Sequence, residues 1–429
     1  MNDAARAVEA VWRLERPKLV AAVARLVRDL DLAEDLAHDA LVAALEHWPR
    51  EGVPDNPAAW LMATAKHRAL DRLRQAALHA RKQGELGADA DARGDHVVPG
   101  VAEAIEAVQA SGADTIADDL LRLVFTACHP VLAPDARVAL TLKLLCGLST
   151  AEIARAFLAA EPTIAQRIVR AKRALLAAQV PYEVPRTDAL PERLDSVLEV
   201  VYLVFNEGYA ASSGDDWMRP ALCDEALRLG RVLTTLLPDD AEVHGLLALM
   251  EFHASRAAAR VDPQGRPVLL MQQDRRLWDA LLIRRAFASL ERSQSLAAAH
   301  DGLGPYALQA SIAACHAGAA RAEATDWQHI VRLYDALARS QPSPVIELNR
   351  AVAVGMAFGA AAALPLVDAL SADAPALSSY HLLPSVRGDL LAKLGRRDEA
   401  RAEFRRAAAL TRNERERALL LERADSIDS

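Results

Sequence analysis

The stretch GLSTAEIARAFLAAEPTIAQRIVRAKRALL, residues 147–176, predicts two helices joined by a short turn. Ser149 and Glu152 have the spacing of a capping box, in which two side chains satisfy backbone N–H groups at the start of a helix. The chain then turns at 159–161, and Pro162 opens the second helix, where a missing N–H costs nothing. Two helices joined in this way predict a helix-turn-helix unit, whose second helix enters the major groove of DNA.

The second helix of this unit is expected to have one apolar side and one basic side. Its basic side offers hydrogen-bond donors suited to base edges and phosphates, and Arg can bind guanine with two hydrogen bonds. A solvated surface helix is the alternative, but residues 162–178 contain no acid, which favours DNA. The candidate DNA-binding residues on this helix are Thr163, Gln166, Arg167, Arg170, Lys172 and Arg173.

A second basic island precedes the helix-turn-helix unit, although the net charge of the chain is -8. Residues 57–82 contain six Lys or Arg side chains and a single acid, Asp71. Residues 83–120 are rich in Asp and Glu, and Arg93 is their only basic side chain. Because a solvated surface mixes charge signs at shorter range, the two islands indicate phosphate-binding surfaces separated by an acidic connector.

The composition predicts an all-α protein of several domains. The chain has 429 residues, 52% of them hydrophobic and only 4% aromatic, and Ala, Leu and Arg recur throughout. These residue types favour helices over sheets. No apolar run reaches the length of about 18 residues that a membrane helix needs, so we expect a soluble, cytoplasmic protein.

The chemistry-bearing residues give no sign of a catalytic or metal site. The four cysteines are far apart and form no CxxC or Cys/His pattern, so they are interpreted as free, buried thiols. His244 and His253 are nine residues apart, which is not the spacing of zinc ligands. We therefore expect no metal, no cofactor and no enzymatic activity.

Three helical regions follow from the hydrophobic pattern. Residues 4–82 form the first, in which Asp31 and Glu34 suggest a capping box and Pro57 opens a later helix. Residues 83–113 are expected to be an acidic linker with a short helix at 101–109, and 114–178 form the second region. Residues 190–425 are expected to form a separate helical domain.

Three motifs in this order resemble the extracytoplasmic-function group of the sigma-70 family. They are DLAEDLAHDALVAALEHW (31–48), NPAAWLMATAKHRALDRLRQ (56–75) and the helix-turn-helix unit, and the resemblance covers about residues 4–178. It implies that 4–82 is a sigma-2 domain, which binds core RNA polymerase and the -10 element, and that 114–178 is a sigma-4 domain, which binds the -35 element. The implied partners are promoter DNA and the β′ clamp helices and β flap of the polymerase.

The resemblance also implies a role for residues of the sigma-2 domain. Those that would bind the -10 element are Lys66, His67, Arg68, Asp71, Arg72 and Arg74. Those that would bind core polymerase are Asp35, Asp39, Leu41, Leu45 and Trp48. The helix of residues 162–173 would read the -35 element.

The C-terminal region resembles the tetratricopeptide-like extension of one sigma subgroup, in which it is thought to govern activity. Gly388, Ala400 and Phe404 lie at tetratricopeptide offsets, where small residues let two helices approach closely. We expect this region to modulate the sigma half, with a protein or peptide as a further partner. Two alternatives stay open: a one-component helix-turn-helix regulator with a helical sensor domain, and a tetratricopeptide-like scaffold.

Overall fold

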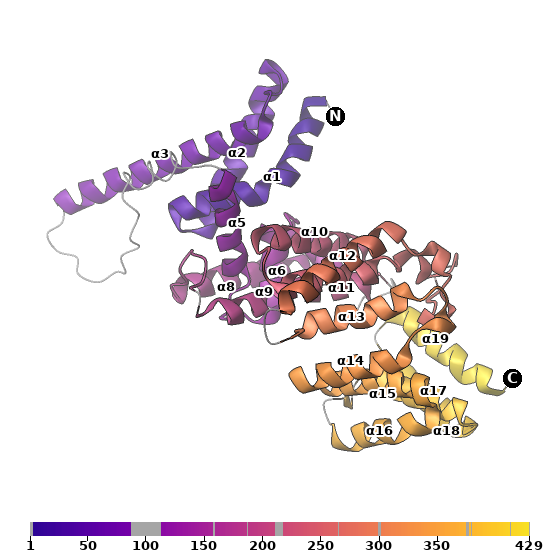
Figure 1. Cartoon of the computed structure of the whole chain (residues 1–429). Helices are drawn as coiled ribbons and strands as arrows, with labels where there is room; N and C mark the ends of the chain where they lie inside the picture. The colour runs from indigo at the N-terminus through magenta and orange to yellow at the C-terminus, as the bar shows by residue number, and fades with distance from the viewer. Residues whose placement is uncertain are drawn as a thin grey trace. The chain divides into compact units, whose positions relative to one another are not determined.

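The structure is a computed structural model that describes most of the chain. The described residues are 3–86, 113–157, 159–186, 188–210, 218–264, 266–298, 302–374, 377–378, 380–411 and 413–428. Among them there is no β-strand, and an isolated antiparallel bridge joins Val261 and Pro267. The all-α expectation is therefore confirmed (Figure 1). The short helix expected at 101–109 lies outside the described residues.

The chain divides into two compact units, residues 1–200 and 201–429. The division falls inside one helix, α9, ten residues after the start that was expected for the C-terminal domain. The α-helices of the first unit and the one that crosses the division are α1 (Asp3–Val27), α2 (Leu30–Glu51), α3 (Pro57–Leu86), α5 (Ala113–Ala127), α6 (Pro134–Leu144), α7 (Thr150–Ala156), α8 (Glu161–Ala177) and α9 (Leu190–Tyr209).

In the first unit, α1, α2 and α3 pack on one another, and α5 packs on α1 (Figure 1). Val20, Trp48 and Leu61 are among the buried side chains of the three-helix part. Pro57 opens α3 as expected, and the side chain of Asn56 accepts a hydrogen bond from the backbone N–H of Ala59 at 3.0 Å.

The expected start of α2 is wrong by two residues. Asp29, not Asp31, is the N-cap, and its carboxylate accepts hydrogen bonds from the N–H groups of Asp31 and Leu32 at 2.8 and 3.0 Å. Glu34 is therefore not part of a capping box. It is 6% exposed and lies in the interior of the unit.

The second unit is a succession of helices in which most pack on the next along the chain, while α13 packs mainly on α11. This is the contact pattern of stacked helical hairpins, although assignment to the tetratricopeptide type stays a prediction. Its helices are α10 (Pro220–Leu236), α11 (Ala241–Ala254), α12 (Ala280–Ala297), α13 (Pro305–Gly318), α14 (Trp327–Ser340), α15 (Pro344–Phe358), α16 (Ala360–Asp373), α17 (Leu382–Lys393), α18 (Arg397–Leu410) and α19 (Glu414–Asp425), with the 3-10 turns η1 (Ala257–Ala259), η2 (Leu270–Gln272), η3 (Arg275–Leu277), η4 (Ala322–Ala324) and η6 (Ser426–Asp428).

The last hairpin shows why small residues are needed between its helices. A Cβ atom added to Gly388 on α17 would lie 3.2 Å from the carbonyl oxygen of Ala400 and 3.2 Å from the ring of Phe404 on α18. Phe404 is 2% exposed and Ala400 is fully buried. The two helices therefore meet at the spacing that the sequence pattern anticipated.

Candidate nucleic-acid interface

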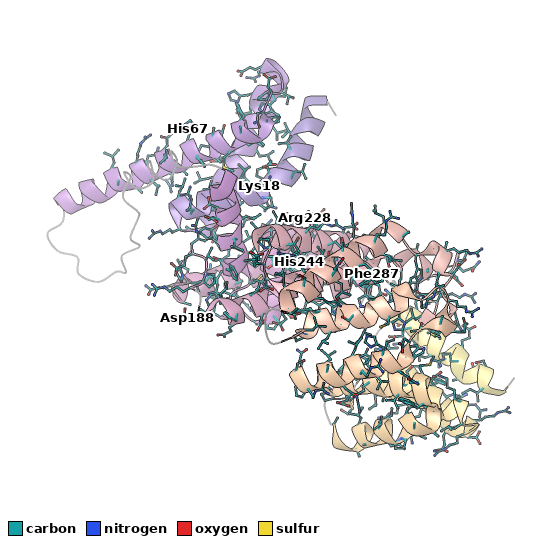
Figure 2. The ribbon with its side chains drawn as sticks, in the orientation of Figure 1. Lys18, His67, Asp188, Arg228, His244 and Phe287 are labelled. Atoms are coloured by element: carbon teal, nitrogen blue, oxygen red, sulfur yellow. The ribbon has the colours of Figure 1, made fainter. Side chains whose placement is uncertain are left out.

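Helix α3 presents a polar, mostly basic face to solvent. His67, Asp71, Arg72 and Arg74 are exposed, and His67 is labelled on this helix in Figure 2. Arg74 forms an ion pair with Asp71 at 3.1 Å, one turn away on the same helix. Arg68 is half-buried and lies 3.4 Å from Asp39 on α2. The expected face is thus largely present, and Arg68 links it to α2.

Lys66 does not belong to this face. Its residue is 6% exposed, on the side of α3 that packs inward. Burial lowers the pKa of Lys66, and the positive charge of Arg25 lowers it further, whereas Asp119 raises it. Because the ammonium group lies among interior charges, Lys66 does not contact DNA in this conformation, contrary to expectation.

Helix α2 has an exposed face that mixes carboxylates with apolar side chains. Asp35 and Asp39 are exposed, Leu45 is 45% exposed, and Leu41 is half-buried. Val42, which the sequence analysis missed, is 50% exposed between them. Helical periodicity could have identified it, since Asp35, Asp39, Val42 and Leu45 stand at i, i+4, i+7 and i+10 and share one side of a helix.

Trp48 was expected on that surface, but it is a core residue. It is 2% exposed, and its ring meets the ring of Trp60 edge to face, with centroids 5.6 Å apart. An aromatic side chain so placed stabilises the packing of α2 on α3. Direct contact of Trp48 with a partner protein is therefore excluded in this conformation.

The capping box that opens α7 is confirmed. The N–H of Ser149 donates to Oε2 of Glu152 at 2.7 Å, and the N–H of Glu152 donates to Oγ of Ser149 at 3.2 Å. Helix α8 follows after a short turn and buries Ile164, Ile168 and Leu175. The helix-turn-helix geometry therefore starts where the sequence placed it.

The opposite face of α8 is open to solvent. Thr163, Gln166, Arg170 and Arg173 are exposed, and Arg167 is half-buried, 3.6 Å from Asp135. Arg170 donates to Gln166 at 3.5 Å, one turn earlier on the helix. Five of the six expected side chains are thus gathered on one accessible face.

Lys172, the sixth, is held by carboxylates of α2. Its Nζ atom lies 2.5 Å from Oδ1 of Asp31 and 2.5 Å from Oε2 of Glu34. The other oxygen of Glu34 accepts from Arg16 at 2.7 Å, and the Arg16 and Glu34 side chains are 5% and 8% exposed. Burial opposes the charge on Lys172, but Glu34 and Asp31 together raise its pKa.

A second contact joins α1 to α5 in the same unit. Arg25 on α1 and Arg122 on α5 both pair with Asp119, whose side chain is 1% exposed, at 2.9 and 2.7 Å. Burial raises the pKa of Asp119, and the two guanidinium groups act against that rise. Tyr182 donates a hydrogen bond to the carbonyl oxygen of Ala21 at 3.0 Å.

The remaining sequence expectations concern cysteines, metals and membranes. All four cysteines are free, Cys128 and Cys146 buried and Cys223 and Cys315 half-buried. Burial raises the pKa of the Cys128 thiol to about 11. Within the described ranges no three His, Cys, Asp or Glu side chains are placed to hold a metal ion, and no helix has the length and apolarity to cross a membrane.

Comparison with known proteins identifies three segments of the chain. Residues 11–78 match Sigma-70 region 2, and residues 122–175 match Sigma-70, region 4. Residues 193–294 match a family of unknown function, DUF6596. The chain is also 44% identical over 413 residues, 96% of this chain and 94% of the relative, to Uncharacterized protein R00370 of Rhizobium meliloti (strain 1021).

A region 2 domain followed by a region 4 domain defines a sigma factor of the sigma-70 family. The chain belongs to the same family as the Rhizobium meliloti protein and is an extracytoplasmic-function-like sigma factor with a DUF6596 domain in its C-terminal extension. These domains point to a non-enzymatic role in transcription initiation, with core RNA polymerase and promoter DNA as the implied partners.

Proposed function

We propose that this chain binds core RNA polymerase and directs it to specific promoters, and that its C-terminal region modulates this activity. The observation that carries the proposal is the pair of exposed basic faces, one on α3 and one on α8, within segments that match regions 2 and 4. A general DNA-binding regulator would need only one of them. The proposed partners on the polymerase are the β′ clamp helices and the β flap.

The face of α8 suits the -35 element. Arg167, Arg170 and Arg173 can bind phosphates without regard to sequence, which gives affinity that falls steeply with salt. Gln166 and Arg170 are placed one turn apart on the exposed face, where long side chains can reach base edges. Phosphate contacts then set the register of the helix in the groove, and base contacts choose the sequence.

The face of α3 suits the -10 element. His67 and Arg72 are exposed in the central part of the long helix, whereas Leu70 and Leu73 are buried. Opening the duplex requires a base to leave its stack at a cost of a few kcal/mol. Contacts from this face to the flanking phosphates, together with the polymerase, would offset that cost.

The exposed face of α2 suits a helical partner. Asp35 and Asp39 supply charge, while Val42 and Leu45 supply apolar area that is otherwise open to water. Apolar anchors surrounded by charges are typical of protein interfaces. We assign this face to the β′ clamp helices.

Transcription in vitro with core polymerase tests the DNA assignment. Replacing Arg167 or Arg170 with Ala should cost about 1–3 kcal/mol of promoter binding and relax specificity at one or two -35 positions. Arg186→Ala, which removes an exposed arginine of the same unit outside α8, is the matched control. A loss that is equal for all promoter sequences would show that these arginines contact only phosphates.

A truncated chain tests the role of the C-terminal region, and the structure indicates where to cut. Arg193 on α9 donates to the carbonyl oxygen of Phe125 at 2.6 Å, and Ser196 donates to that of Cys128 at 2.5 Å. Arg137 on α6 donates to Glu199 at 2.9 Å. A cut at Val184 would remove these partners, so the chain should end at Val200.

If the C-terminal region modulates the sigma half, the chain ending at Val200 should transcribe at a rate different from that of the full chain. Equal rates for the two proteins, in vitro and in cells, would remove the modulation from the proposal. The chain ending at Val184, which lacks α9, is the control for lost packing. It should melt at a lower temperature than the chain ending at Val200.

A further inference from the structure

The second unit contains a cavity of about 490 Å³ among α9, α11, α13 and α14. Its floor is apolar, with Leu249, Phe252 and Ile312, and its walls carry polar groups. Pockets of about 300–1,000 Å³ with an apolar lining and a few placed polar groups are typical of small-molecule sites.

Aromatic side chains are concentrated in this cavity. The whole chain is only 4% aromatic, yet one cavity gathers five aromatic side chains, two of them from α9 and the others from different parts of the second unit. They are Tyr202, Tyr209, Phe252, Trp278 and Tyr334. The Tyr209 ring also lies 5.2 Å from the ring of His253, centroid to centroid. A flat, apolar body is the kind of ligand that such walls fit.

The indole ring of Trp278 forms part of the lining, and the residue is 7% exposed. The guanidinium carbon of Arg275 lies 4.6 Å and that of Arg256 5.9 Å from the centroid of this ring. The Nε1 atom of Trp278 and the Nδ1 atom of His316 have no hydrogen-bond partner, but protein atoms cover both of them, so a ligand in the cavity does not reach them. The polar group that the cavity offers to a ligand is therefore the guanidinium group of Arg256.

The charge of the cavity is positive. Its lining includes the guanidinium group of Arg256 and no Asp or Glu side chain. Arg256 donates to the hydroxyl of Tyr209 at 2.6 Å and meets Nδ1 of His253 at 2.9 Å, and both partners are uncharged groups. Burial and the neighbouring arginines lower the pKa of His253 well below its usual value and that of His316 to about 4, so neither adds charge near neutral pH.

We propose that this cavity binds a small aromatic carboxylate. The carboxylate would accept hydrogen bonds from Arg256, while the ring would lie against Phe252, Ile312 and the indole ring of Trp278. A carboxylate fits better than a neutral acceptor because Arg256 offers a charge that none of the described lining residues neutralises. The site lies wholly in the second unit, so the proposal does not rest on promoter recognition.

Calorimetric titration of the full-length protein tests the proposal. The probes are benzoate, 4-hydroxybenzoate and indole-3-acetate, each compared with its primary amide. At least one carboxylate should bind with one-to-one stoichiometry, and its amide should bind about tenfold more weakly or worse, which corresponds to about 1.4 kcal/mol. The same carboxylate should raise the melting temperature of the protein in proportion to its occupancy.

Variants locate the binding. Arg256→Gln should weaken binding of the carboxylate by about tenfold or more, and Trp278→Ala, which removes one of the aromatic rings that line the cavity, should weaken it several-fold. Arg276→Gln is the matched control, because Arg276 is 90% exposed, two residues from Trp278, and outside the cavity. Circular dichroism and melting curves check that each variant is folded.

Three results would overturn the proposal: none of the three carboxylates binds, the amides bind as well as the acids, or both cavity variants bind as tightly as Arg276→Gln. If Arg256→Gln is misfolded, Trp278→Ala and the comparison of acids with amides decide. Since neither polymerase nor DNA is present, a failure here leaves the transcription assay of the proposed function unaffected, and the converse also holds.

Discussion

Replacing Lys172 with Met should loosen the contact between α8 and α2 in the free protein. The lysine Nζ lies 2.5 Å from Glu34, whose side chain is 8% exposed, and 2.5 Å from Asp31, whose side chain is 69% exposed. A hydrogen bond to a charged group contributes about 1.5–3 kcal/mol, and an exposed ion pair at most about 1 kcal/mol. Glu34 keeps its bond to Arg16 in the variant, so the penalty for an unpaired charge stays small.

The free energy that holds α8 against α2 should therefore fall by about 2 kcal/mol. This change raises about 30-fold the ratio of molecules in which the two helices are separated to molecules in which they are in contact. Distance measurements between probes at Glu46 on α2 and Gln166 on α8, both exposed positions, would detect this shift in the full-length protein without DNA. Lys18→Met is the control, because Lys18 pairs with Glu15 on its own helix at 3.0 Å (Figure 2). If Lys172→Met and Lys18→Met give the same distance distribution, the lysine does not hold α8 against α2.

Three further outcomes are expected. Asp35→Arg combined with Leu45→Glu should weaken association with core polymerase about tenfold or more in a titration, because charge and apolar area are lost from one face of α2. Arg50→Glu, in the last turn of α2, is the control and should leave the association unchanged. Gly388→Val should lower the free energy of unfolding by about 1–3 kcal/mol, because the added side chain clashes with Phe404. Ala402→Val, on the exposed face of α18, should have little effect. Equal melting curves for the two variants would contradict the close approach of α17 to α18. The folded protein holds the pKa of His316 at about 4, so the unfolded chain takes up a proton first as pH falls below 6.5. Between pH 6.5 and 4, His316 should therefore contribute at most about 3 kcal/mol to a loss of stability to which His253 also contributes. His316→Gln should reduce the slope of stability against pH in melting experiments, and an unchanged slope would refute this prediction.

The parts of the fold that local patterns control were predictable from the sequence. A capping box at Ser149 and Glu152, a proline at position 57, and the apolar side of α8 each depend on residues within one or two helical turns. The exposed residues of α8 followed in the same way, since the periodicity of a helix places polar side chains opposite the core. The match to regions 2 and 4 accords with those local patterns.

The predictions that were wrong concern side chains whose environment is determined by a distant segment of the chain. Glu34 has the spacing of a capping residue, yet Arg16 and Lys172 draw it into the interior. Lys66 belongs to a basic run but lies on the buried side of α3, close enough to Arg25 and Asp119 for both charges to affect its pKa. The aromatic cavity of the second unit brings together residues from 202 to 382, which no periodicity connects.

The engagement of Lys172 makes the two carboxylates of α2 an internal counterion for the recognition helix. When a free lysine binds a phosphate, the DNA sheds a condensed cation, and this release produces the usual dependence of affinity on salt. Lys172 is instead paired with Glu34 in a buried contact, which salt screens little. Because Lys172 stays with its carboxylates as salt is added, promoter affinity should fall less steeply with salt than a count of the cations on α8 implies, and Lys172→Met should leave the slope almost unchanged.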